Sequence, residues 1–226
     1  MRLLLALFII SVSQFLFAAQ SGLRFESCED PNYIEYVNNR LDFYKKTRKE
    51  AYEKAQQNLQ VTPFANMSSS EKRLFLHTNT ILSARFDSKE QALFYIEAFE
   101  KSTSLLRRLF GMRGHMDIVH RTNIARAWLA SKEGDKEETI KYLLKSTQVT
   151  ASPVLVSFGP DRELIRELYQ QGEREAVLEY LERVSVFWNN ESATEYLQLW
   201  RKMIKHNCPI QFQFYDTTST ESFNLD

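Results

Sequence analysis

The chain has 226 residues, enough for one domain with a substantial core, and its 29 basic and 29 acidic side chains balance to a formal net charge of +0. A chain without net charge has no general attraction to nucleic acid or anionic lipid, so nucleic acid is not expected as a partner. Only 6 glycines and 5 prolines occur, too few for an all-β sandwich or for glycine-rich nucleotide loops. The composition therefore favours helices, and without a Walker-type or dinucleotide-binding motif we expect no cofactor.

The first twenty residues have the pattern of a secretory signal peptide. Arg2 precedes an apolar run over residues 3–10, and small residues at Ala18-Ala19 lead into a polar sequence. One positive charge, a short apolar segment and small residues before the cleavage point define such signals, so residues 1–20 predict export. The alternative is an uncleaved anchor, because the apolar stretch is almost long enough to cross a bilayer. No second apolar stretch of about 18 residues follows, so no membrane span is expected after cleavage.

Two cysteines bracket the helical part of the chain. Cys28 lies just before the first predicted helix and Cys208 just after the last. In an oxidising compartment a disulfide between them would clamp the two ends of the fold. The alternative is two unpaired thiols whose Cα atoms stay more than about 7 Å apart. Two cysteines without a histidine pair are too few for a zinc site, so no metal is expected.

Apolar residues recur at three- and four-residue steps along most of the chain and predict an all-α fold. An N-terminal helical segment, residues 21–114, is expected to begin with a helix at Asp30-Pro31, an N-cap followed by proline. Capping residues, among them Ser68, Asp135 and Ser192, together with glycines place about eight helices. Their approximate ranges are 31–60, 69–87, 89–111, 115–133, 136–146, 161–171, 174–185 and 193–207.

The chain ends in a segment, residues 209–226, that does not follow the helical pattern. The stretch Ile210–Tyr215 alternates like a strand, but no partner strand is predicted for it. We therefore expect an extended tail laid against the helices.

Residues 115–208 contain an internal repeat with an offset of 38 residues. The small and apolar residues before and after Gly134 match those around Gly172 in type and spacing. This pattern resembles two degenerate tetratricopeptide hairpins, in which small residues let two helices cross closely and glycine makes the turn. The Ser152–Gly159 stretch then reads as a loop inserted between the hairpins. The repeat predicts antiparallel helical hairpins stacked as a short α-solenoid.

A more specific resemblance rests on the motif Ser152-Pro153-x-Leu155-x-Ser157-Phe158-Gly159-Pro160, together with His120-x2-Asn123 upstream. These residues look like those of a family of small bacterial proteins with tetratricopeptide-like hairpins, and the resemblance covers roughly residues 115 to 215. It implies a helical scaffold and a bacterial source, so that a chain exported by its signal segment is expected in the periplasm or secreted. The family has no established activity, so the resemblance supplies no catalytic residue.

The repeat register predicts a partner-binding groove. In stacked hairpins the first helix of each pair lines a concave surface, at repeat positions 2, 5, 9, 12 and 13. Those positions hold Arg121, Ile124, Trp128, Ser131 and Lys132 in the first hairpin, and Gly159, Arg162, Arg166, Tyr169 and Gln170 in the second. Four cations and two aromatic rings suit an acidic peptide or protein segment. The alternative is that these are ordinary helix faces, with Trp128 in the core and the arginines paired by Glu163 and Glu167.

His120, Asn123 and Ser157 offer an enzymatic alternative. A histidine, an amide and a serine could form a small envelope hydrolase site if the chain brought them together. The competing interpretation is that His120 and Asn123 hydrogen-bond the backbone of the Ser152–Pro160 stretch. Without a nucleophile-elbow motif we favour the structural interpretation. The sequence therefore predicts an exported all-α binding or scaffold protein, whose partner could also be a host protein if the chain is secreted.

Overall fold

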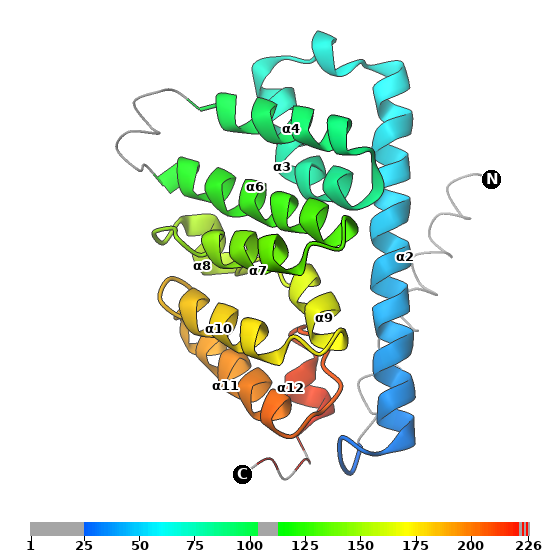
Figure 1. Ribbon diagram of the computed structural model, residues 1–226, viewed down its shortest axis with the longest axis vertical. Helices are drawn as coiled ribbons and strands as arrows, with labels where there is room; N and C mark the ends of the chain where they lie inside the picture. Colours follow the sequence, from blue (N-terminus) through cyan, green and yellow to red (C-terminus); the bar gives the residue numbers. More distant parts are fainter. Residues whose placement is uncertain (1–24, 104–112, 222, 224, 226) are drawn as a thin grey trace, which may run out of the picture.

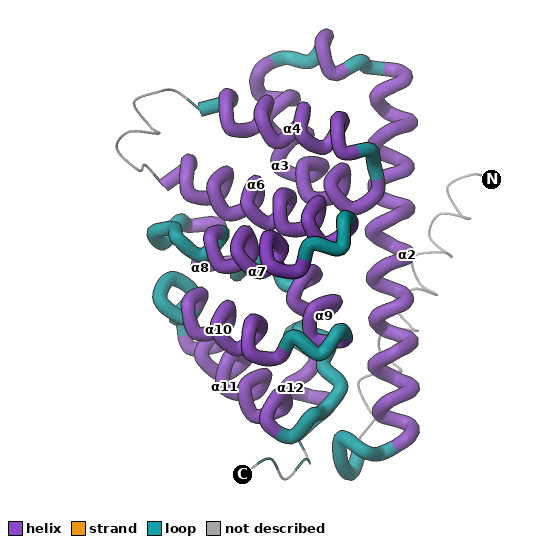
Figure 2. Tube along the Cα trace, viewed as in Figure 1, coloured by secondary structure: helices purple, strands orange, loops and turns teal. Residues whose placement is uncertain are grey.

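The structure is a computed structural model that describes residues 25–103, 113–221, 223 and 225. Every regular element in this part of the chain is a helix (Figure 2), which confirms the all-α prediction. Residues 1–20, predicted as the signal peptide, lie outside the described residues, as does the end of the helix expected over 89–111. None of the helices in the described ranges is both long and apolar enough to cross a membrane.

The N-terminal part consists of α2 (Pro31–Val61), the short 3-10 helix η1 (Phe64–Asn66), α3 (Ser69–Phe86) and α4 (Lys89–Lys101). The predicted caps are confirmed: the Asp30 carboxylate accepts from the Asn32 amide at 2.8 Å. Ser68 and Glu71 form a reciprocal capping box at the start of α3. Helix α2 runs along one side of the whole molecule (Figure 1).

The remaining helices form a stack beside α2. They are α6 (Arg113–Lys132), α7 (Lys136–Lys145), α8 (Pro153–Phe158), α9 (Glu163–Gln170), α10 (Arg174–Val184), α11 (Glu191–Lys205) and α12 (Asp216–Ser219). Contacts run from α3 to α6, α6 to α7, α7 to α10 and α10 to α11, so each layer packs on the next. One large apolar cluster joins this stack to the start of α2 and includes residues from Phe25 to Leu225.

The two predicted hairpin turns share one geometry. Gly134 and Gly172 have φ of 74° and 88°, in the left-handed region that glycine enters without a Cβ clash. The amide of Asp135 donates to Ala130 O at 3.0 Å, and the amide of Glu173 donates to Leu168 O at 2.9 Å. These bonds satisfy carbonyls at the ends of α6 and α9, as in a Schellman motif.

Three local predictions are wrong. The Ser152–Gly159 stretch is the helix α8 rather than a loop, because the Ser152 hydroxyl caps the Leu155 amide and Pro153 takes the first helical position. Helix α11 is capped by Asn190, whose side chain accepts from the Ala193 amide at 2.9 Å, and not by Ser192.

The third wrong prediction concerns the tail, which is extended only at its start. Residues 210–212 are buried, and α12 follows. The fully buried Asp216 carboxylate accepts from Trp200 Nε1 at 2.9 Å and from the Gln213 amide at 2.9 Å. These bonds fold the chain back against α11. The strand-like alternation does not follow burial, because Gln211 is buried together with the apolar residues on either side of it, whereas Phe214 is exposed.

The two ends of the described fold are joined covalently. Cys28 and Cys208 form a disulfide with their Cα atoms 5.0 Å apart. Tyr33 Oη beside it donates to Pro209 O at 2.8 Å. Both cysteines are buried, so the bridge fastens the start of α2 to the segment after α11.

Candidate functional site: an arginine-lined pocket

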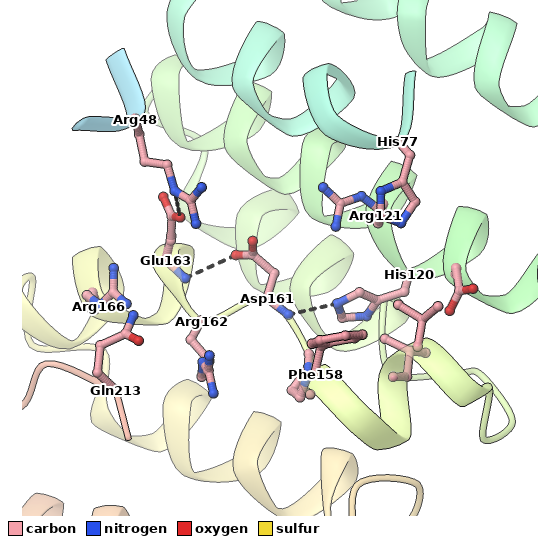
Figure 3. A pocket seen from close by; sticks show the side chains of 15 residues that line it. Arg48, His77, His120, Arg121, Phe158, Asp161, Arg162, Glu163, Arg166 and Gln213 are labelled. Carbon is pink, nitrogen blue, oxygen red and sulfur yellow. Dashed lines mark hydrogen bonds and ion pairs between the residues drawn. The ribbon is translucent and has the colours of Figure 1, made fainter. Parts of the chain in front are cut away.

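A pocket of about 380 Å³ opens where α8 and the start of α9 meet α6, α3 and α2. We call it the arginine pocket. Its lining residues are Arg48, His77, Asp117, His120, Arg121, Val154, Leu155, Phe158, Gly159, Pro160, Asp161, Arg162, Glu163, Arg166 and Gln213. Figure 3 shows the Asp161 carboxylate and the Arg121 guanidinium directed toward its centre, with His120 and Phe158 at one side. Its volume falls in the range of ordinary small-ligand sites.

His120 fixes the chain at one side of the pocket. The amide of Asp161 donates to His120 Nε2 at 3.0 Å, so the proton of the neutral ring lies on Nδ1, which donates to Ser146 O at 3.0 Å. Burial of the ring, which disfavours the charged form, lowers the pKa of His120 to about 4. Burial, and after it the charge of Arg121, likewise lowers the pKa of His77 to about 4. Both histidines are therefore neutral at pH 7.

Three arginines of the pocket keep donor groups without a partner in the described part of the chain. These buried atoms are Arg121 Nε, Arg162 Nη1 and Arg166 Nη2. Burial lowers the pKa of all three guanidinium groups, but arginine stays charged at any ordinary pH. An unpaired donor on a buried cation costs several kcal/mol unless water or a ligand satisfies it. The three donors are therefore the strongest indication of a ligand in this structure.

Contacts with aromatic rings and the C-terminal segment hold two of these arginines in place. The Arg162 guanidinium lies 4.5 Å from the Phe214 ring centroid and 5.6 Å from that of Trp188. Arg166 donates through Nε to Gln211 O and stacks 4.9 Å from the Tyr44 ring. Rigid placement lowers the entropy that either side chain would lose on binding.

The acidic residues of the pocket form no ion pair with these three arginines in the described part of the chain, although burial, which lowers the pKa of Arg166, is partly offset by the nearby charges of Glu163 and Asp161. Glu163 pairs with Arg48 of α2 and Arg85 of α3, so the expectation that it pairs the arginines of its own helix is wrong. Asp161 Oδ1 accepts from the Glu163 amide at 3.0 Å, and Asp117 accepts from the Ser152 hydroxyl. Four arginines and three carboxylates line the pocket, which leaves a formal charge of about +1 with neutral histidines.

The structure brings together four of the ten residues predicted to line a groove. Arg121, Arg162 and Arg166 all line the arginine pocket, as does Gly159. Other predicted groove residues lie elsewhere: Lys132 Nζ donates to Asp87 O at 2.6 Å, and Tyr169 Oη donates to Cys208 O at 2.8 Å.

The prediction that Trp128 and Ile124 line the groove is wrong. Trp128 is 3% exposed and Ile124 is fully buried, because α3 covers this face of α6. Arg85 of α3 lies 4.4 Å from the Trp128 ring. Neither side chain can contact a ligand in this conformation. Ser131 is half-buried and Gln170 is exposed, and neither lines the pocket.

The residues of the hydrolase alternative are not assembled. Asn123 lines a different pocket with Arg126 and Tyr142, and its Nδ2 donates to Val119 O at 2.8 Å. Ser157 is exposed and does not line the arginine pocket. Both ring nitrogens of His120 are held by backbone groups, but these belong to Ser146 and Asp161 and lie outside the Ser152–Pro160 stretch that the structural interpretation named.

Several pocket residues could not be found from the repeat register. Arg48, His77 and Asp117 come from α2, α3 and the first turns of α6, where no hairpin register applies. Asp161 and Phe158 lie inside or beside the recognised motif but were not assigned a role. In the part of the chain that the structure describes, no group of histidines, cysteines and carboxylates could hold a metal ion.

Comparisons with known proteins add no assignment. No protein-family model matches the chain, and no curated protein or solved structure matches it. The class that the fold and the pocket define is therefore that of an all-helical, disulfide-clamped protein with a cationic pocket.

Proposed function

We propose that this protein is an exported binding protein, built from tetratricopeptide-like helical hairpins, that recognises an acidic protein or peptide through the arginine pocket. The observation that carries the proposal is the set of unpartnered guanidinium donors on Arg121, Arg162 and Arg166. Carboxylates accept from guanidinium groups in short, charge-assisted hydrogen bonds, so an acidic segment supplies the missing partners.

The export part of the proposal has independent support. The chain begins with a signal-like segment, and Cys28 and Cys208 are bonded to each other. Disulfides persist mainly in oxidising compartments such as the bacterial periplasm. Mass measurement after alkylation of the protein from intact bacteria should find no free thiol and a chain shortened by about twenty residues. Two alkylated cysteines on a full-length chain would contradict export.

Binding can be tested with a labelled decapeptide of alternating glutamate and leucine that has a free carboxyl terminus. We expect its fluorescence anisotropy to rise on titration with the protein, and the affinity to fall at least tenfold between low and 0.5 M salt, where screening is strong. An amidated lysine–leucine decapeptide should not bind.

The matched variants are Arg121→Gln and Arg126→Gln, five residues apart on α6. Arg121 lines the pocket, whereas Arg126 pairs with Glu100 through two bonds of 2.6 and 3.1 Å outside it. Arg121→Gln should weaken binding at least tenfold and Arg126→Gln less than twofold, with circular dichroism confirming that both fold. Equal effects of the two variants, or binding of the lysine peptide, would overturn the proposal.

A further inference from the structure

The arginine pocket combines a cationic interior with an apolar edge, and the pairing restricts the chemistry of its ligand. We propose that the pocket takes a single carboxylate that carries an apolar group next to it, in preference to a run of acidic side chains or a phosphoryl group. This inference rests on the proposed function and names the ligand class that the site would select.

The charge of the lining favours a monoanion. With Glu163 held between Arg48 and Arg85, and Asp161 and Asp117 also at the wall, the lining carries a formal charge of about +1. One carboxylate brings this charge to zero. A phosphate group, at about −1.5 to −2, would leave excess negative charge beside the pocket carboxylates in a poorly solvated site.

The donors also favour a small planar anion. Arg121 reaches the pocket from α6, while Arg166 reaches it from α9. Each offers a buried nitrogen that lacks a partner. A carboxylate is a planar acceptor that either guanidinium can bind in a charge-assisted hydrogen bond.

The edge of the pocket supplies the apolar contact. Phe158 is 73% exposed and Val154 is 37% exposed. They lie four residues apart on α8 and so share one face of this helix. Both line the pocket, where Figure 3 shows the Phe158 ring beside His120. Large apolar side chains left open to water next to buried cations suit a ligand with an apolar group beside its acid.

Two sources present this chemistry: a small organic acid and the last residue of a peptide. The probes are N-acetyl-leucine, its amide, the glutamate–leucine decapeptide with a free or amidated carboxyl terminus, and inorganic phosphate. Titration calorimetry at low salt should give at least tenfold tighter binding for each free acid than for its amide, and no heat with phosphate. A decapeptide that binds tenfold tighter than N-acetyl-leucine identifies a peptide terminus, and equal affinities identify the small acid.

The apolar edge is tested by Phe158→Ser, with Val186→Ser as the matched control. Val186 is 78% exposed and lies outside the pocket, so both changes remove a solvent-exposed apolar side chain. Phe158→Ser should weaken binding of N-acetyl-leucine at least fivefold but leave acetate binding within twofold. Val186→Ser should change neither.

Failure of this inference can be distinguished from failure of the proposed function. If the amidated decapeptide binds as tightly as the free acid, the pocket reads side-chain carboxylates, and only the inference is overturned. Phosphate binding at equal affinity, or an unchanged affinity in Phe158→Ser, overturns it as well. If no acidic probe binds the wild-type protein, both the inference and the proposed function are overturned.

Discussion

Trp128 and Arg166 occupy equivalent positions in the two hairpins, 38 residues apart, yet one belongs to the core and the other to the candidate site. Both are nearly buried, at 3% and 7% exposure. Trp128 stacks with Arg85 of α3, whereas Arg166 stacks with Tyr44 of α2. At this position the first hairpin has a ring that contacts an arginine of α3, and the second hairpin has an arginine that contacts a ring of α2.

The difference comes from what covers each hairpin. Helices α3 and α4 pack on α6, so its outer face is completed by apolar neighbours. Helix α9 has eight residues and packs on α10 and α6. Its Glu163 and Arg166 contact side chains of α2 and the segment after α11. The same turn geometry therefore follows Trp128, whose face of α6 is covered, and Arg166 of α9, whose Nη2 still lacks a partner in the described part of the chain. A repeat register predicts turns better than it predicts exposure.

The largest expected effect is a difference in the free energy of unfolding when the two equivalent residues are replaced. Trp128→Ala leaves a large cavity in the core and should lower the free energy of unfolding by about 3–5 kcal/mol. Arg166→Met keeps the volume and removes a buried, incompletely paired charge, a change that is often close to neutral. Urea denaturation should therefore separate the two variants by at least about 2 kcal/mol. An Arg166→Met variant as unstable as Trp128→Ala would identify Arg166 as part of the core.

Most of the fold could be predicted from the sequence because local chemistry determines it. Asp30, Ser68 and Asp135 are short polar residues placed before apolar periodicity, and each caps a helix in the structure. Helix α8 was missed because six residues between two prolines are too short to show a helical period. The folded tail was not predicted, because the hydrogen bond from Trp200 Nε1 to the Asp216 carboxylate that holds it joins residues 16 apart.

The residues of the candidate site could be predicted only where they occupy positions of the hairpin repeat. Arg121, Arg162 and Arg166 follow from helix positions, because these positions set which face a side chain takes. The pairing of Glu163 with Arg85, 78 residues away, has no local signal. The apolar edge at Phe158 could not be recognised, because a Phe in a short apolar run reads as core.

Acid should change the stability of the first hairpin and of the C-terminal segment beside the second hairpin in opposite directions, and this is the second test. The folded pKa of His120 is about 4, below its ordinary value of 6.5. Between these values the unfolded chain binds a proton that the folded chain excludes. Lowering the pH from 7 to 5 therefore costs about 2 kcal/mol of stability at His120. The half-buried His77, with its pKa also near 4, acts in the same direction.

Asp216, which anchors the segment beside Arg166, opposes this loss. Burial raises its pKa from 3.8 to about 6 despite the bonds from Gln213 and Trp200, so the folded chain takes up the proton first. The same drop from pH 7 to 5 therefore adds about 1 kcal/mol. In Asp216→Asn this gain is absent, and stability measured by urea denaturation should fall about 1 kcal/mol further than in the wild type. Asp42→Asn, an exposed carboxylate on α2, is the control. Parallel pH profiles for Asp216→Asn and the wild type would contradict the assignment.

The smallest expected effect concerns the glycine turns, whose geometry is the same in the two hairpins. A Cβ built on Gly134 or Gly172 meets no atom within 4 Å, so Gly134→Ala and Gly172→Ala should each lower the free energy of unfolding by the backbone cost alone, about 1 kcal/mol. Asparagine should cost less, because it tolerates positive φ, as Asn207 does at 59° after α11. There the Cys208 amide donates to Met203 O at 2.9 Å, which repeats the bond of the glycine turns. Thermal or urea unfolding of the four variants should give equal values at the two sites. A difference above about 0.5 kcal/mol would show that the turns respond to what covers their helices, as Trp128 and Arg166 do.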